Sequence, residues 1–193
     1  GVRAALTMGD VQTAGAAVPF PEELLSAERR GEFHSEDALT QALFYRLRTM
    51  DAASLRDIVG MDEGLEYRFL RAAQTAASRE ELIAAIKSKR YTHARLSRLC
   101  AHILLGVSRD FAAAHRAPTY ARVLGFRKDA APLLRAIKAH ASIPLVTKAA
   151  AFDRADPLFS LDVRAQDLWS LGVSNPALRA PGRDFTTSPI ILP

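Results

Sequence analysis

The stretch from Thr92 to Gly106, THARLSRLCAHILLG, decides the fold class of this 193-residue chain. Its apolar residues recur at spacings of three and four, the period of an amphipathic α-helix; they are Leu96, Leu99, Cys100, Ile103 and Leu104. Thr92 suits the N-cap position, and Gly106 ends the pattern. We therefore expect a helix with one face in a core. Cys100 shares that face, so it is expected to be a buried small hydrophobe rather than a nucleophile.

The remaining pattern predicts a mainly α fold, with a helical bundle followed by a small βαβ unit and a C-terminal helix. Helices are expected over residues 21–30, 36–50, 51–60, 62–77 and 78–86. Ser78 and Glu81 form a capping box at the start of the last of these.

After residue 117 the pattern changes. Residues 119–126 and 143–147 are rich in strand formers and flank a helix expected over 129–141, which predicts two parallel strands. Asp156 opens a final helix that reaches about residue 171, and residues 190–192 can add a short strand. The domain boundaries expected are 1–20 for a linker that can include the end of a preceding domain, 21–116 for the helical region, and 117–193 for the βαβ unit, final helix and tail, with the last two packed as one domain.

Composition excludes several classes of protein. Hydrophobic residues make up 49% and charged residues 24% of the chain, the range of globular proteins. No apolar run approaches the roughly 18 residues of a membrane span, so we expect a cytoplasmic protein with no membrane partner. A single cysteine allows neither an internal disulfide nor a cysteine-based zinc site.

The common catalytic motifs are absent from the sequence. It contains no GxGxxG, GxxxxGK[ST] or GxSxG, and its five histidines form no HExxH pair. We therefore predict no catalytic residue and no metal site in this chain.

The positive charge is concentrated in the middle third. The net charge is +5, but residues 79–128 alone carry 11 basic and 3 acidic residues. Lys87, Lys89 and Arg90 precede the helix N-terminus at Thr92, where free backbone N–H groups favour an anion. Arg95, Arg98 and His102 recur along the polar face of the helix. This pattern favours binding of a phosphate backbone; the alternative is a solvated helix whose arginines pair with acids such as Glu63 or Glu66.

The same segment carries a family resemblance. Residues 87–107, KSKRYTHARLSRLCAHILLGV, resemble the K-x-KRYT-x-x-R-x-x-R-x-x-x-x-x-LLG stretch of the tRNA(Met) cytidine acetate ligases, bacterial proteins of the nucleotidyltransferase superfamily. Residues 63–66 (EGLE), 120–126 (YARVLGF) and 143–148 (IPLVTK) resemble further segments of that family in the same order. The resemblance spans roughly residues 1–170.

The resemblance implies an activity for the whole enzyme. ATP activates acetate to acetyl-adenylate, and the acetyl group passes to N4 of the wobble cytidine of elongator tRNA(Met); ATP is the implied cofactor, and Mg²⁺ is left open. The family's HxGH motif, which handles ATP, does not occur here. We therefore expect a C-terminal, tRNA-binding portion that lacks the catalytic domain and is inactive alone. Its expected partners are tRNA and its own N-terminal catalytic domain, with a homo-oligomer left open.

Site residues follow from the resemblance and the charge pattern together. Residues 1–3 resemble the end of the family's S-x-T-x-[IV]-R motif, which makes Arg3 a candidate ATP-binding residue; the alternative is an ordinary surface arginine. Tyr91 is the candidate base or ribose stacker. The expected tRNA phosphate contacts are Lys87, Lys89, Arg90, Arg95, Arg98, Arg122 and Lys128.

Two other functions remain open from the sequence. Residues 79–128 could instead dock another domain or a second subunit without binding RNA. The chain could also be an enzyme in its own right, gripping a nucleotide with the basic loop and using Asp153 or Asp156 as a base.

Overall fold

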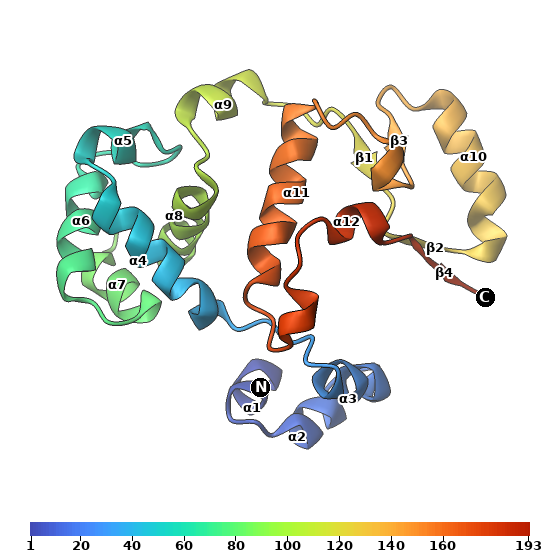
Figure 1. The fold of residues 1–193 in the computed structure, drawn as a ribbon, viewed down its shortest axis with the longest axis horizontal. Coiled ribbons are helices and arrows are strands. Elements are labelled where there is room, and N and C mark those ends of the chain that lie inside the picture. Colours follow the sequence, from blue (N-terminus) through green and yellow to red (C-terminus); the bar gives the residue numbers. More distant parts are fainter.

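The computed structural model describes residues 1–193 apart from the side chains of Arg3 and Glu36, and it is mainly helical (Figure 1). The mainly α class predicted from the sequence is confirmed. The helices are α1 (Val2–Thr7), α2 (Val11–Ala16), α3 (Pro21–Arg29), α4 (Thr40–Thr49), α5 (Ala52–Asp57), α6 (Leu65–Thr75), α7 (Arg79–Ile86), α8 (His93–Leu105), α9 (Arg109–Ala114), α10 (Ala131–His140), α11 (Pro157–Ser170) and α12 (Arg183–Thr186). The strands are β1 (Ala121–Arg122), β2 (Gly125–Arg127), β3 (Leu145–Val146) and β4 (Ile190–Leu192).

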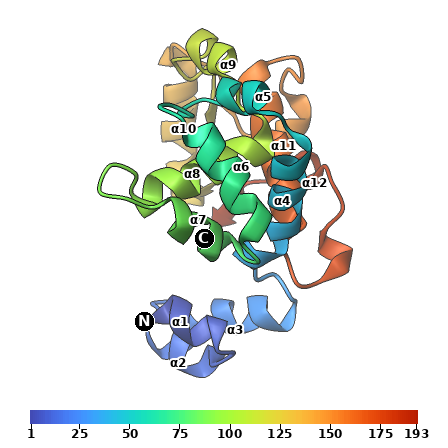
Figure 2. The ribbon, with the colours of Figure 1, turned by 90° about the vertical axis from the view of Figure 1, so that its left-hand side faces the viewer.

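These elements gather into three groups. Helices α4–α8 form a bundle, α10–α12 with the strands form a second group, and α1–α3 form a separate small unit below the level of both (Figures 1 and 2). The backbone of residues 31–35 joins the small unit to the end of α11: Ser35 N–H donates to Gly172 O at 2.9 Å, and Asn175 N–H donates to Gly31 O at 3.0 Å. No helix in the described part of the chain is long and apolar enough to span a membrane.

The main core lies inside the α4–α8 bundle, and α8 supplies one wall of it. Cys100 is 2% exposed in this core, which confirms the prediction of a buried thiol. Thr92 caps α8 by accepting a hydrogen bond from Arg95 N–H at 3.3 Å, and Gly106 ends the helix in the left-handed region at φ 66°. Packing therefore fixes which face of α8 points outward.

Ser78 caps the N-terminus of α7 as predicted, and the return bond of the box comes from Ala77, one residue before the N-cap. Glu81 N–H donates to Ser78 Oγ at 3.1 Å, and the Glu81 carboxylate accepts from Ala77 N–H at 2.8 Å. This cap fixes the start of α7, which leads directly into the loop of Lys87, Lys89 and Arg90 before α8.

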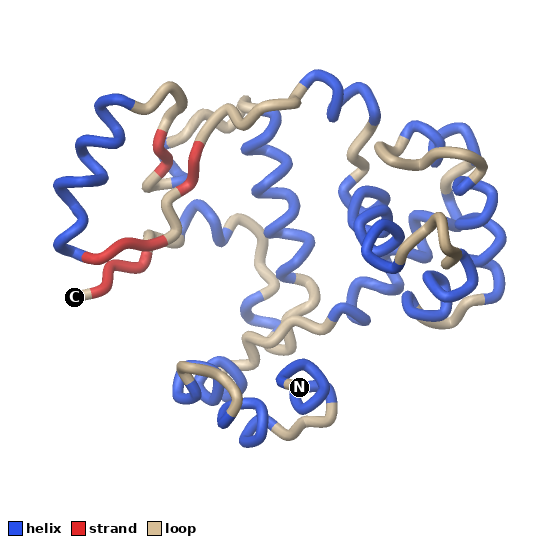
Figure 3. Tube along the Cα trace, turned by 180° about the vertical axis from the view of Figure 1, so that it is seen from behind, coloured by secondary structure: helices blue, strands red, loops and turns tan.

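The strands lie at one end of the molecule (Figure 3). β1 pairs in parallel with β3, with α10 between them in the chain, and β2 pairs in parallel with β4. The sequence predicted one strand over 119–126, whereas the chain splits there between two sheets. Gly125 allows the second pairing, since a Cβ at this position would lie 2.9 Å from the carbonyl oxygen of Ile190.

Residues 1–20 were predicted to be a linker but contain α1 and α2, and α9 was also missed. These helices have six residues each, too few for an apolar stripe to repeat. Their caps carried the available signal: Asp10 accepts from Thr13 N–H at 3.0 Å, and Ser108 accepts from Phe111 N–H at 3.1 Å.

Candidate nucleic-acid interface

The loop before α8 holds two lysines free of carboxylates. Ser88 N–H donates to Tyr91 O, and Tyr91 N–H donates to Ser88 Oγ, each at 3.2 Å, so the loop closes on itself. Lys87 and Lys89 point from this turn into solvent, and within the described residues neither makes an ion pair. Exposed, unpaired ammonium groups at a helix N-terminus are suited to phosphate oxygens.

Arg90 and Tyr91 lie in the same loop but have partners. Arg90 pairs with Glu63, and the Tyr91 hydroxyl donates to the other oxygen of that carboxylate at 3.1 Å. Tyr91 is 4% exposed and belongs to the bundle core. Its ring has no free face for a base or ribose, so the structure does not support the stacking role predicted for it. It anchors the loop instead.

On α8 the two predicted arginines differ in their surroundings. The guanidinium of Arg95 lies 5.2 Å from the Tyr91 ring centroid and 3.5 Å from an Asp62 carboxylate oxygen. Arg98, one turn further, is exposed and has no carboxylate partner in the described part of the chain. His102 turns inward, with Nδ1 3.1 Å from Val59 O. The alternative of arginines paired with acids therefore holds for part of the helix, and Arg98 remains free.

The structure does not leave Arg122 available as a phosphate contact. Its guanidinium donates to Asp184 at 2.5 Å and to Asp162 at 3.1 Å, and its side chain is 22% exposed. The hydrogen bonds that Arg122 donates to these carboxylates, the one to Asp184 first, raise the pKa of Arg122. Lys128 is exposed and unpaired within the described residues, which keeps it a candidate.

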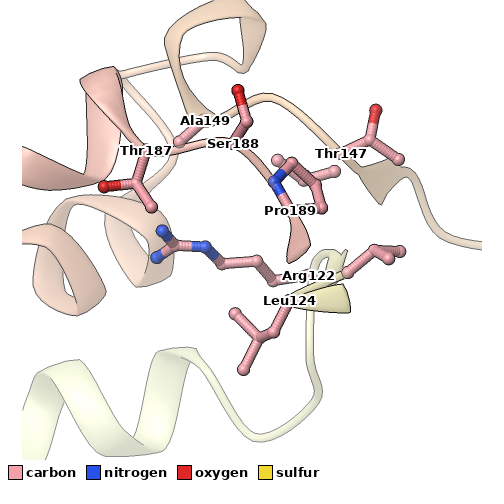
Figure 4. Close-up of a pocket in the computed structure, with 9 residues that line it drawn as sticks. Arg122, Leu124, Thr147, Ala149, Thr187, Ser188 and Pro189 are labelled. Carbon is pink, nitrogen blue, oxygen red and sulfur yellow. The ribbon is translucent and has the colours of Figure 1, made fainter. Parts of the chain in front are cut away.

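A small cavity lies beside Arg122 (Figure 4), lined by Arg122, Val123, Leu124, Val146, Thr147, Ala149, Thr187, Ser188 and Pro189. Its volume of about 50 Å³ accommodates a water molecule or two. A nucleotide needs several hundred Å³, so this cavity is not a nucleotide site.

Sequence reasoning missed Arg68 on α6. Its guanidinium lies 5.5 Å from the Tyr91 ring centroid, which brings it to the basic loop although it is 19 or more residues away in sequence. The exposed Arg71 follows one turn later on the same helix. The i, i+3 spacing of Arg68 and Arg71 is the signal in the sequence for a basic polar face on this helix.

The two candidate bases, Asp153 and Asp156, are engaged in hydrogen bonds with backbone N–H groups of their own segment. Asp156 caps α11 by accepting from Phe159 N–H at 2.9 Å, a bond that lowers the pKa of its carboxyl, so it is a poor base at neutral pH. Asp153 accepts from Ala155 N–H at 2.9 Å. Among the described residues no group of three His, Cys, Asp or Glu side chains could hold a metal ion. The side chain of Arg3 lies outside the described residues.

Comparison with known proteins yields one family and one fold. The family model for HIGH nucleotidyl transferases matches residues 1–183. A tRNA(Met) cytidine acetate ligase from Geobacillus sp. (strain WCH70) is 33% identical over 162 residues, covering 83% of this chain and 40% of the relative. The Acetivibrio thermocellus ligase of the same name is 38% identical over 154 residues, covering 76% and 37%. The chain thus spans about two fifths of the length of these curated relatives.

A solved structure has the same fold. Thermotoga maritima TmcAL, crystallised with alpha-thio ATP, superposes with a TM-score of 0.89 at 24% identity, over 99% of this chain and 51% of that one. An apo crystal form of the same protein superposes with a TM-score of 0.88.

These matches correct two expectations. We expected a C-terminal portion from which the nucleotidyltransferase part is absent, but the HIGH nucleotidyl transferase model itself matches residues 1–183, so that expectation is wrong. We also expected a tRNA-binding appendage, whereas the relatives that match most of the chain are named for the ligase. The absence of an HxGH motif does not exclude the family, because one short motif does not define a family's whole pattern.

Proposed function

The chain belongs to the HIGH nucleotidyl transferase family, and on that basis we propose that it acts as a tRNA(Met) cytidine acetate ligase. In the proposed reaction a carboxylate oxygen of acetate attacks the α-phosphorus of ATP, and pyrophosphate leaves. The N4 amine of the cytidine then attacks the acetyl carbonyl carbon, AMP leaves, and the amine loses a proton. The substrate is the wobble cytidine of elongator tRNA(Met), as the sequence resemblance implies.

The observation that carries the RNA side of this proposal is the group of unpaired cations around the start of α8. Lys87, Lys89 and Arg98 are exposed and free of carboxylates in the described structure. Phosphate contacts hold an RNA in register, and contacts to base edges specify its sequence. We therefore assign these three side chains, with Lys128, to the tRNA backbone, and treat Arg90 and Arg95 as cations whose carboxylate partners must be displaced first.

The support for ATP as a substrate comes from a similar solved structure and not from side chains of this chain. The Thermotoga maritima structure was obtained with an ATP analogue, which makes ATP the expected nucleotide here. The 193 residues contain no HxGH motif, and the small cavity beside Arg122 is too small for a nucleotide. We assign the adenylation step to no residue of this chain other than the candidate Arg3.

The test supplies the protein with ATP, radiolabelled acetate and an elongator tRNA(Met) transcript. We expect acetylated cytidine in the nuclease-digested RNA, together with AMP and pyrophosphate, and no product when ATP or acetate is omitted. RNA that stays unacetylated while binding tightly would contradict the ligase assignment. Failure to bind RNA at any salt concentration would contradict the interface and favour a docking surface for another protein.

A further inference from the structure

Three arginines from different parts of the chain meet around one buried tyrosine. The guanidinium carbons of Arg68 and Arg95 lie 5.5 and 5.2 Å from the Tyr91 ring centroid. Arg90 is joined to the same tyrosine through Glu63, whose two carboxylate oxygens accept from Arg90 and from the Tyr91 hydroxyl. Stacking on the ring holds planar guanidiniums in place while their N–H groups remain free to donate.

Positive charge is in excess at this cluster. Asp62 is the carboxylate nearest Arg95, at 3.5 Å, but it lies closer to Arg109, at 2.7 Å. Arg68 has no carboxylate partner within the described residues. The guanidiniums of Arg68 and Arg95 both lie within 5.5 Å of one ring centroid, and an anion near them would reduce the repulsion between their charges. Glu63 pairs with Arg90 alone, and Asp62 is shared between Arg95 and Arg109.

Glu63 is held in an unfavourable backbone conformation. Its φ of 57° makes it the one described residue other than glycine in the left-handed region, and Gly64 follows at φ 80°. Such a conformation persists only where surrounding contacts maintain it, and it concentrates at functional sites. The Glu63 side chain is 43% exposed, so a ligand in solution can reach and replace it.

We propose that the guanidiniums of Arg68, Arg90 and Arg95 form one phosphate-binding site for the RNA backbone, occupied in the free protein by the Glu63 carboxylate. The inference rests on the proposed function and adds Arg68 and Glu63 to its RNA interface. A phosphate oxygen takes the place of the carboxylate oxygen on Arg90 and gains Arg68 as a second donor, because phosphate and carboxylate oxygens both accept guanidinium N–H bonds. Tyr91 stays buried and positions the arginines.

Removing the internal carboxylate should strengthen RNA binding. Glu63→Gln keeps the side-chain length and removes the competing charge, so Arg90 contributes one full phosphate contact. We expect the slope of log K against log salt to steepen by about 0.7 to 0.9 and the affinity at about 0.1 M salt to rise roughly 5- to 8-fold. Glu28→Gln is the matched control, since it removes an exposed acid from α3 and should leave the slope unchanged.

The measurement is a titration of a tRNA(Met) transcript against the full chain at several salt concentrations. In an Arg90→Gln background the gain from Glu63→Gln should vanish, because both act through one contact. Arg68→Gln should make the slope shallower by about 0.7 to 0.9, whereas Arg29→Gln on α3 should not. Glu63→Gly, which also relieves the left-handed backbone, should bind at least as tightly as Glu63→Gln.

The outcomes separate this inference from the proposed function. If the wild-type protein binds RNA and the Glu63→Gln variant binds it with the same or weaker affinity, the inference is overturned. The proposed RNA interface is not contradicted by that result. Loss of affinity in Glu63→Gln with restoration in Glu63→Gly also overturns it, because that pattern assigns Glu63 a purely structural role. Wild-type protein that does not bind RNA overturns both.

Discussion

Replacing Lys87 and Lys89 together by glutamine should remove two phosphate contacts without disturbing the fold. Both side chains are exposed and unpaired within the described residues, and the loop keeps its shape through hydrogen bonds between Ser88 and Tyr91. Each lost contact should make the salt slope shallower by about 0.7 to 0.9, a combined change of about 1.4 to 1.8. At about 0.1 M salt this corresponds to roughly 25- to 60-fold weaker binding, or about 2 kcal/mol.

Fluorescence anisotropy with labelled tRNA(Met) transcript, from about 50 to 400 mM KCl, measures both the slope and the affinity. The control is the double variant Arg29→Gln with Lys148→Gln, which removes the same charge from exposed positions outside the α4–α8 bundle. Far-ultraviolet circular dichroism checks that both variants remain folded. The reasoning is refuted if the loop variant and the control change the slope equally, because binding would then depend on net charge rather than on this loop.

Three further predictions concern groups away from the loop. Burial raises the pKa of the Cys100 thiol to about 11, so a thiol reagent at about pH 8 should modify it only after denaturation; rapid labelling of native protein would contradict its place in the core. Arg122→Leu should lower the free energy of unfolding by about 3 kcal/mol in urea titrations, since Asp184 stays largely buried without its cation, and should leave the RNA salt slope unchanged. The bond from Phe159 N–H lowers the pKa of Asp156, so its contribution to stability is present above the ordinary carboxyl pKa and is lost as pH falls through the folded-state value; Asp156→Asn should show a smaller loss of Tm on acidification than wild type.

The parts of the fold that the sequence predicted are those set by neighbouring residues. The start of α8 at Thr92, its end at Gly106 and the burial of Cys100 all depend on contacts within a few turns. The burial of Tyr91 was not predicted because it comes from the packing of the whole bundle, which also brings Arg68 of α6 to within 5.5 Å of its ring centroid. A polar flanking sequence predicts a polar loop, but it does not reveal a ring covered from elsewhere in the chain.

The sequence also does not reveal which basic side chains are paired with carboxylates in the fold. This pairing changes the expected salt dependence of RNA binding. Of the seven basic residues assigned to phosphate from the sequence, three have a carboxylate within 4 Å: Arg90, Arg95 and Arg122. Seven free cations would give a slope of about −5 to −6, whereas four give about −3. A contact from Arg68 would make the slope for four cations steeper by about one unit at most, and so would the release of Arg90 from Glu63. The measured slope therefore distinguishes the charge written in the sequence from the charge that the fold leaves available to RNA.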